Sequence, residues 1–99
     1  MINRVAKGRR LELKAKKELE SEGYRIAFRS IRTVYNRVDF DNAWDIVCYN
    51  SRHWRFVQVK TGYMPSKERV RLTDIKYPGY VDKEIWCWRN RRWYKDYAN

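Results

Sequence analysis

The segment formed by residues 44–60 constrains the fold more than any other part of this chain. It holds two runs rich in β-branched and aromatic residues, 44–49 and 54–60, on either side of the polar segment 50–53. Such runs are typical of β-strands, and a short polar segment between them is typical of a turn. The sequence therefore predicts an antiparallel hairpin here.

The register of this hairpin decides which polar side chains share a face, because side chains alternate along a strand. If Tyr49 pairs with Trp54, counting back along the first strand places Asp45 opposite Gln58. Lys60 then lies on the same face, so an acid, an amide and an amine form one patch. A shift of one residue would move Asp45 to the opposite face.

The net charge predicts the kind of partner. The chain has 99 residues, the size of one small domain spanning 1–99, and carries 23 basic and 12 acidic residues for a net charge of +11. So much positive charge on a small body favours nucleic acid, because each phosphate that is neutralised releases counterions. A merely soluble basic surface is the simpler alternative. Binding to a membrane surface is less favoured, since no helix pairs a broad apolar face with a purely basic one.

Several classes of protein lack support in the sequence. There is no run of about 18 apolar residues and no secretory signal near the first residue, so we expect an intracellular, cytoplasmic protein. Cys48 and Cys87 lie in apolar runs, and His53 is the single histidine, which favours buried thiols over a zinc site. Motifs for acyl transfer and for nucleotide binding are also missing.

The N-terminal part predicts a helix that Asn3 caps, that runs to about Glu22 and that Gly23 ends. Its apolar stripe consists of Val5, Gly8, Leu11, Ala15 and Leu19, with Arg10, Lys14 and Lys17 on the opposite side.

Glu12 falls inside this apolar stripe, where an acid is unusual. Two explanations stand side by side. The carboxylate either reaches out from the helix edge or pairs with an arginine, or it points at a metal or another polar group on the sheet beneath.

The remaining chain predicts further strands and loops. Residues 24–29 alternate and form the first strand, 30–43 form a basic, partly mobile loop, and 68–75 form a short helix or strand. Segments 84–89 and 92–97 predict a terminal hairpin.

The aromatic residues of this terminal hairpin have two explanations. Trp86, Trp88, Trp93 and Tyr94 could stack on nucleic-acid bases. The commoner roles of such side chains in a small domain are the core or a dimer face.

Basic residues of the N-terminal helix and the loop are the candidate phosphate contacts. The predicted nucleic-acid-binding residues are Arg9, Arg10, Arg29, Ser30, Arg32 and Arg37. An ordinary solvated loop is the alternative for those in segment 30–43.

Three short motifs stand out: Lys-Gly-Arg-Arg-Leu-Glu at 7–12, Trp-Asp-Ile-Val at 44–47 and Gln-Val-Lys at 58–60. Together they resemble the PD-(D/E)XK nuclease superfamily, and in particular the archaeal-type Holliday junction resolvases. In that family a helix with a glutamate precedes an aspartate at the start of the second strand and a Glu-x-Lys at the end of the third. The resemblance implies an α/β, restriction-endonuclease-like fold: a small mixed central sheet with an N-terminal helix packed on it. It also implies a homodimer that cuts branched or distorted DNA.

The implied catalytic residues are Glu12, Asp45, Gln58 and Lys60. Mg²⁺, for which Mn²⁺ can substitute, prefers oxygen ligands. Asp45 would be the charged ligand, with the Gln58 oxygen and the Val59 carbonyl as neutral ones and Glu12 reaching metal-bound water. Lys60 would orient the attacking water, assist its deprotonation or stabilise charge on the phosphate.

Gln58 stands where the family has a glutamate, so weaker metal binding is expected. The alternatives are an ordinary ion pair between Asp45 and Lys60, a non-catalytic nucleic-acid-binding module that keeps the nuclease fold, and an RNA-binding or RNA-processing protein.

Overall fold

The structure, a computed structural model, describes residues 4–33 and 35–98. The cap predicted at Asn3 lies outside these residues. The side chains of Val5 and Arg32 are likewise outside the described part, so their predicted roles in the helix stripe and in nucleic-acid binding are not placed by it.

Helix α1, Arg4–Ser21, confirms the predicted N-terminal helix. Two residues after its end stands Gly23, whose φ of 93° lies in the left-handed region that glycine adopts without steric penalty. The Tyr24 N–H then donates to the Leu19 carbonyl at 3.1 Å, which closes the helix end. Leu11, Ala15 and Leu19 are buried, as the predicted stripe requires.

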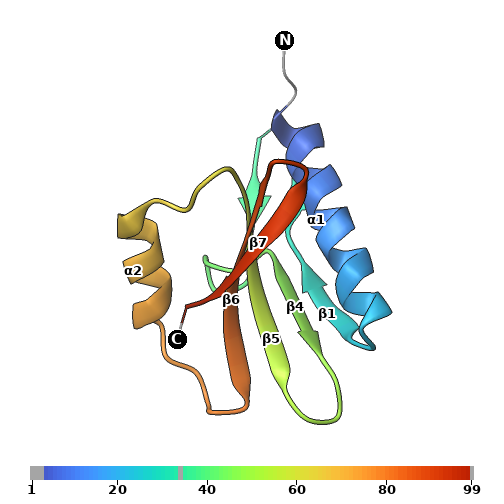
Figure 1. Ribbon diagram of the computed structural model, residues 1–99, viewed down its shortest axis with the longest axis vertical. Helices are drawn as coiled ribbons and strands as arrows, with labels where there is room; N and C mark the ends of the chain where they lie inside the picture. The colour runs from blue at the N-terminus through green and yellow to red at the C-terminus, as the bar shows by residue number, and fades with distance from the viewer. Residues whose placement is uncertain (1–3, 34, 99) are drawn as a thin grey trace.

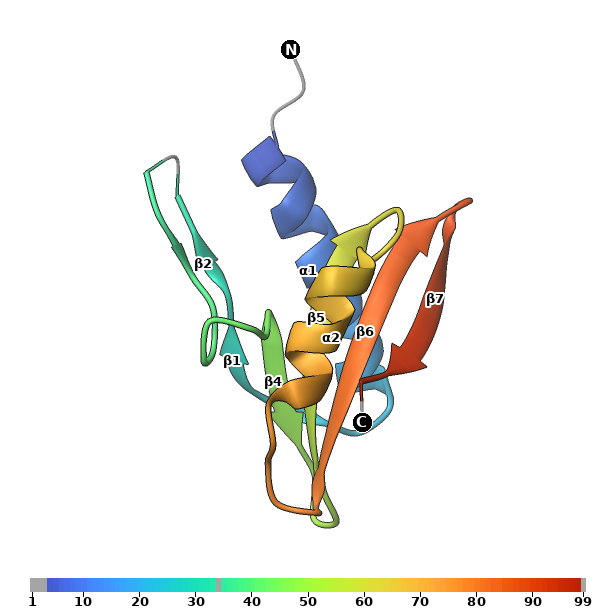
Figure 2. The same ribbon diagram turned by 90° about the vertical axis from the view of Figure 1, so that its left-hand side faces the viewer.

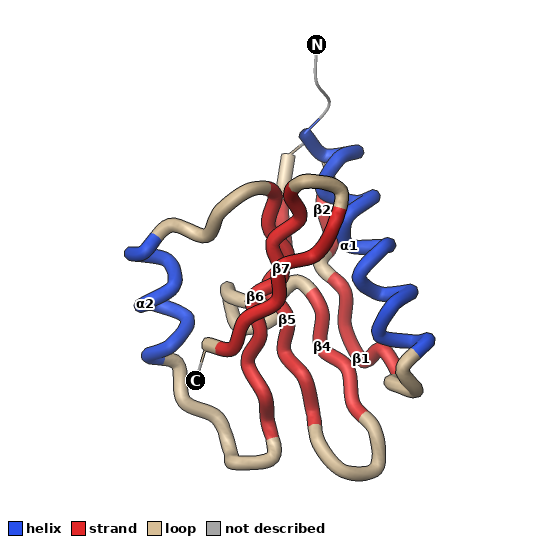
Figure 3. Tube along the Cα trace, in the orientation of Figure 1, coloured by secondary structure: helices blue, strands red, loops and turns tan. Residues whose placement is uncertain are grey.

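The helix packs on a mixed five-stranded sheet in the order β1-β4-β5-β6-β7 (Figures 1 and 3). The strands are β1 Arg25–Arg29, β4 Ile46–Tyr49, β5 Trp54–Thr61, β6 Val81–Arg89 and β7 Arg92–Tyr97. Strands β5 and β6 are parallel and the other neighbours are antiparallel. The chain is therefore a mixed α/β fold with an N-terminal helix on its sheet.

The register of the β4–β5 hairpin is the predicted one, with Tyr49 opposite Trp54 and Ile46 opposite Val57. The Asp45 N–H donates to the Val57 carbonyl at 2.9 Å, which extends the ladder to the residue before β4. Ile46 and Val57 point toward α1 and pack with its apolar stripe.

Helix α2, Ser66–Asp74, connects the parallel strands β5 and β6 and covers the other face of the sheet (Figure 2). Parallel neighbours require such a crossover, and a helix is its usual form. Leu72 of α2 is fully buried in the core on this face, together with Val47 and Phe56. The structure thus resolves segment 68–75, for which the sequence left helix and strand open, as mainly helix.

The prediction that residues 30–43 form a loop is wrong for four of them, which lie in two short strands. Strands β2 Ile31–Arg32 and β3 Arg37–Val38 form an antiparallel ribbon, which projects from the body of the molecule in Figure 2. The Thr33 hydroxyl accepts hydrogen bonds from the N–H groups of Tyr35 and Asn36 at 3.3 and 3.0 Å. A side chain therefore stabilises the turn, so the segment needs no glycine or proline there.

The terminal hairpin is confirmed, with Asn90 and Arg91 at its turn. Trp86 is completely buried, and Trp88 and Trp93 pack against the core on the α1 side. The core role of these tryptophans is therefore the one that the structure favours. No helix in the described part of the chain is long and apolar enough to cross a membrane.

Candidate functional site

Asp45 is the centre of the candidate site. Its side chain is completely buried, and the Val59 N–H donates to Oδ2 at 2.7 Å. Its own carbonyl accepts from the Ser30 N–H at 2.7 Å. Asp45 is thus fixed between the end of β1 and the C-terminal half of β5, because its backbone and side chain both bond to neighbouring strands.

Two further groups donate to the other oxygen of this carboxylate. The Ser30 hydroxyl lies 3.0 Å and Arg37 Nη2 2.7 Å from Asp45 Oδ1. Ser30 is 7% exposed and Arg37 is 41% exposed. Both were predicted to contact nucleic acid; in the structure they contact the acid of the site.

Asp39 supplies a second carboxylate that the sequence analysis did not assign to the site. Arg37 Nε donates to Asp39 at 3.0 Å, and the Ser30 hydroxyl lies 2.5 Å from Asp39 Oδ1. Asp39 and Asp45 therefore share a guanidinium and a hydroxyl. An acid among the arginines of this segment was the available signal, but its role depends on the fold of the ribbon.

Gln58 contacts Asp45 as the predicted register requires. In the orientation that satisfies the Gln58 amide, its nitrogen donates to Asp45 Oδ2 at 3.3 Å and to the Ala43 carbonyl. The reverse orientation would place the amide oxygen against these same two oxygens, which is unfavourable unless a cation lies between them. The contact from Val59 is its N–H, whereas the predicted ligand atom is its carbonyl.

Lys60 is exposed near the end of β5, two positions beyond Gln58 and on the same face by alternation. Its charge acts on Glu68 of α2. A hydrogen bond from Arg71 lowers the pKa of Glu68, and the charges of Lys60 and Arg37 lower it further. The start of α2 thus faces the site. The sequence could not predict this contact, because it left helix and strand open for segment 68–75.

Glu12 is 2% exposed, so its carboxylate does not reach out from the helix edge into solvent. It lies on α1, whereas Gln58 alternates onto the α2 side of the sheet. Among the residues that the structure describes, no three His, Cys, Asp or Glu side chains form a group that could hold a metal ion. The structure thus brings Asp45, Gln58 and Val59 together. Among the described residues, Glu12 does not form a three-acid group with them.

Burial raises the pKa of Asp45 above its ordinary value of 3.8, while the Val59 N–H and Arg37 act in the opposite direction. A nearby cation stabilises the ionised form of such a buried carboxylate. Here the cation is Arg37.

The ion that the sequence motifs imply is Mg²⁺. Two carboxylates around one guanidinium provide a cation position with the hard oxygen ligands that Mg²⁺ prefers. Gln58 can add a neutral oxygen if its amide turns over. The residues present therefore fit a divalent ion, provided that it displaces Arg37.

We found no family model, curated protein or solved structure that matches this chain. An assignment of function therefore depends on the site and its surroundings.

Proposed function

We propose that this chain is a metal-dependent DNA endonuclease of the PD-(D/E)XK type that hydrolyses phosphodiester bonds in branched or distorted DNA. The observation that carries the proposal is that Asp45, just before β4, contacts both Gln58 and Val59 of the neighbouring strand β5. These three residues are the strand part of the motif that resembles archaeal-type Holliday junction resolvases.

The order of the elements supports a restriction-endonuclease-like fold. If β1, β4 and β5 are taken as the first three strands, α1 with its glutamate precedes them. Asp45 lies at the start of the second, Gln58 and Lys60 lie near the end of the third, and α2 takes the place of the helix that usually follows in that family.

Each residue of the site would have a separate role in hydrolysis. Asp45 would hold Mg²⁺ or Mn²⁺, with the Gln58 oxygen and the Val59 carbonyl as neutral ligands. The chemistry supplied by such an ion is polarisation of the phosphate and a lower pKa of bound water. Exposed Lys60 would bring its ammonium group to the phosphate, where it stabilises developing negative charge.

The charge distribution supports a DNA partner. Arg9 and Arg10 of α1 are exposed, as is Arg29 at the end of β1, and the net charge of the chain is +11. These exposed side chains would contact phosphates, and such contacts gain free energy from counterion release. We also propose a homodimer, because its two active sites could each cut one of the two DNA strands.

A second candidate is a non-catalytic nucleic-acid-binding module with the same fold. The contacts that favour it are those of Arg37 and the Gln58 amide, which both donate to Asp45 and stabilise its carboxylate without a metal. In this case the polar cluster would serve the structure alone.

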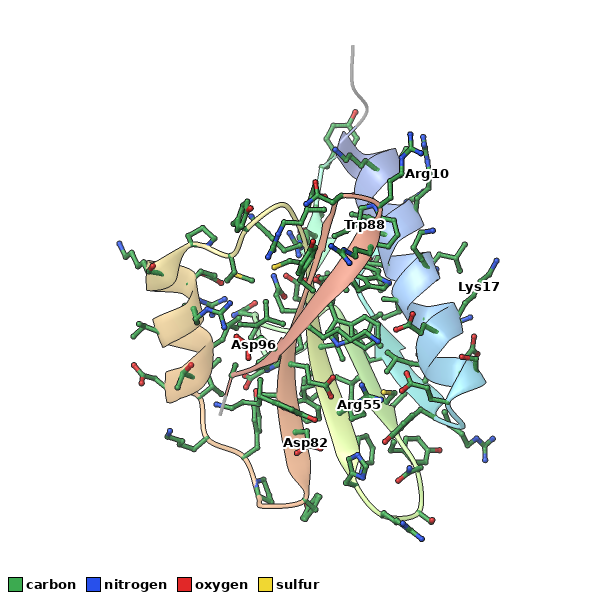
Figure 4. The ribbon with its side chains drawn as sticks, viewed as in Figure 1. Arg10, Lys17, Arg55, Asp82, Trp88 and Asp96 are labelled. Atoms are coloured by element: carbon green, nitrogen blue, oxygen red, sulfur yellow. The ribbon has the colours of Figure 1, made fainter. Side chains whose placement is uncertain are left out.

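Cleavage assays separate the two candidates. The protein is incubated with a four-way junction, a flap and a linear duplex in Mg²⁺ or Mn²⁺. The endonuclease predicts cutting of the branched substrates that is lost in Asp45→Ala and Lys60→Ala. Lys17→Ala is the matched control, because Lys17 lies on the outer side of α1 (Figure 4).

Two other outcomes have a clear meaning. No cutting of any substrate, with salt-dependent binding that both variants retain, would favour the binding module. A preference for RNA over DNA in competition would favour an RNA partner.

A further inference from the structure

We propose that the turn between β6 and β7, with the loop after β5, forms a separate binding surface for an unpaired nucleic-acid strand. We call it the hairpin-end surface and define it by Tyr63, Arg89, Arg91, Arg92 and Tyr94. Tyr63 would stack on a base, and the arginines of the turn would contact phosphates. The inference rests on the nucleic-acid partner of the proposed function and does not depend on cleavage.

The aromatic part of the hairpin-end surface is organised around Arg89. Its guanidinium carbon lies 4.1 Å from the ring centroid of Tyr63 and 3.8 Å from that of Tyr94. Arg89 Nη1 also contacts the Gly62 carbonyl at 3.4 Å, and Arg92 Nε donates to the Tyr94 hydroxyl at 3.0 Å. These contacts hold Tyr63 in place before any ligand binds.

Tyr63 is the ring that remains accessible. It is 74% exposed, and Arg89 stacks on one face only, so the other face is open to a base. Trp88 and Trp93 are less suited, because they pack on each other at 5.0 Å and Lys14 Nζ lies 4.7 Å from the Trp88 ring centroid. An exposed, fixed aromatic ring beside arginines is the usual platform for single strands.

The backbone of the turn points to a role for Arg91. Its φ is 61°, in the left-handed region where a two-residue hairpin turn ordinarily has glycine. Strained backbone of this kind clusters at functional sites. Residues 85–95 also contain four basic residues and no acidic one, so the turn is uniformly positive.

The hairpin-end surface adjoins the C-terminal end of β5, the strand that carries Gln58 and Lys60 of the candidate site. Figure 1 shows the β6–β7 turn at the same end as the start of α1, and Figure 2 shows the β2–β3 ribbon on the opposite side of this end. Figure 4 places Trp88 and Arg10 at this end as well. Tyr63 follows Lys60 by three residues. A strand stacked on Tyr63 would therefore pass beside Lys60, as in DNA with an unpaired arm.

The test measures binding of the full chain by fluorescence anisotropy in EDTA, so that cleavage plays no part. The probes are a labelled oligothymidylate of about 20 nucleotides and a blunt duplex of similar length. We expect Tyr63→Ala to weaken binding of the oligothymidylate about tenfold, because stacking on one ring is lost. The duplex should bind with less than about a twofold change, and Tyr63→Phe should bind both probes normally.

A second pair of variants tests the arginine. Arg91→Gly should weaken binding of the oligothymidylate and lower the slope of log K against log salt by about one. Glycine adopts a φ of 61° freely, so this variant should melt at the wild-type temperature or above it. Arg52→Gly removes the same charge at the β4–β5 turn, at the opposite end of the molecule, and should leave binding unchanged.

The inference would be overturned by equal losses on both probes in Tyr63→Ala, or by equal effects of Arg91→Gly and Arg52→Gly. A concentration-dependent dimer that Tyr63→Ala abolishes would also overturn it, since the surface would then bind a second copy. If the variants behave as expected but no substrate is ever cut, the proposed catalysis fails and the hairpin-end surface stands.

Discussion

Arg37 Nη2 lies 2.7 Å from Asp45 Oδ1, so a guanidinium from the β2–β3 ribbon is paired with the buried acid that precedes β4. The same guanidinium contacts Asp39 at 3.0 Å. Because Mg²⁺ and Arg37 would be attracted to the same oxygens, the affinity for metal depends on how readily the ribbon releases its arginine.

Arg37→Gln should therefore raise the affinity for metal. We expect Mn²⁺ to bind about tenfold more tightly, because a competing positive charge is removed from the two carboxylates. Calorimetric titration with Mn²⁺ measures this directly. Arg52→Gln is the control, since Arg52 is exposed in the β4–β5 turn at the opposite end of the molecule, and it should leave the affinity unchanged. An unchanged affinity in Arg37→Gln would show that the metal does not compete with Arg37.

Asp45→Asn should abolish cleavage and raise thermal stability. Since burial raises the pKa of Asp45, the folded chain binds this proton more tightly than the unfolded chain does, and stability falls as pH rises through the raised pKa. Asparagine removes the charge and keeps an acceptor for the Val59 N–H, while the half-exposed Arg37 keeps Asp39 as its partner.

We therefore expect Asp45→Asn to melt a few degrees above the wild type near pH 7 and to lose cleavage. The difference should shrink as the pH falls through the raised pKa of Asp45, where the wild-type carboxylate becomes protonated. Thermal denaturation across this pH range measures it, with exposed Asp74→Asn as the control. A variant less stable than the wild type at neutral pH would mean that the ion pair with Arg37 outweighs the burial of the charge.

Gln58→Glu should make stability depend on metal. Without a metal, the new carboxylate would face Asp45 Oδ2 and the Ala43 carbonyl, where the amide nitrogen now donates. We expect a lower Tm in EDTA, a larger rise of Tm on adding Mg²⁺ than in the wild type, and cleavage at least equal to the wild type. A lower Tm with no response to Mg²⁺ would argue against a cation at this position.

Lys83 of β6 stabilises the end of α2, and its replacement tests the placement of this helix. Its ammonium group donates to the carbonyls of Leu72, Thr73 and Ile75 at 3.0, 2.8 and 2.6 Å, and the residue is 5% exposed. Carbonyls at a helix C-terminus attract a cation.

Lys83→Met should reduce the free energy of unfolding by about 1–3 kcal/mol, because three buried or part-buried carbonyls lose a charged donor. Denaturant unfolding measures the loss. Lys76→Met is the control, since Lys76 is exposed and its Nζ donates to the Thr73 carbonyl at 3.2 Å. Equal stabilities of Lys83→Met and the wild type would contradict the capping role.

The sequence predicted the elements that are defined by contacts between near neighbours in the chain. The 3.6-residue period located α1 and its buried Glu12, and alternation across a short turn gave the register of β4 and β5. The contact between Asp45 and Gln58 follows from that register. The terminal hairpin was found in the same way.

Only the tertiary structure decided the pairings between distant segments. The parallel pairing of β5 with β6 joins residues separated by the whole of α2, so no local pattern specifies it. It also decided that the β2–β3 ribbon carries Arg37 to Asp45, eight residues further along the chain. A periodic pattern shows which face of an element is buried, but the partner of a charged side chain is set by the folding of other segments around it.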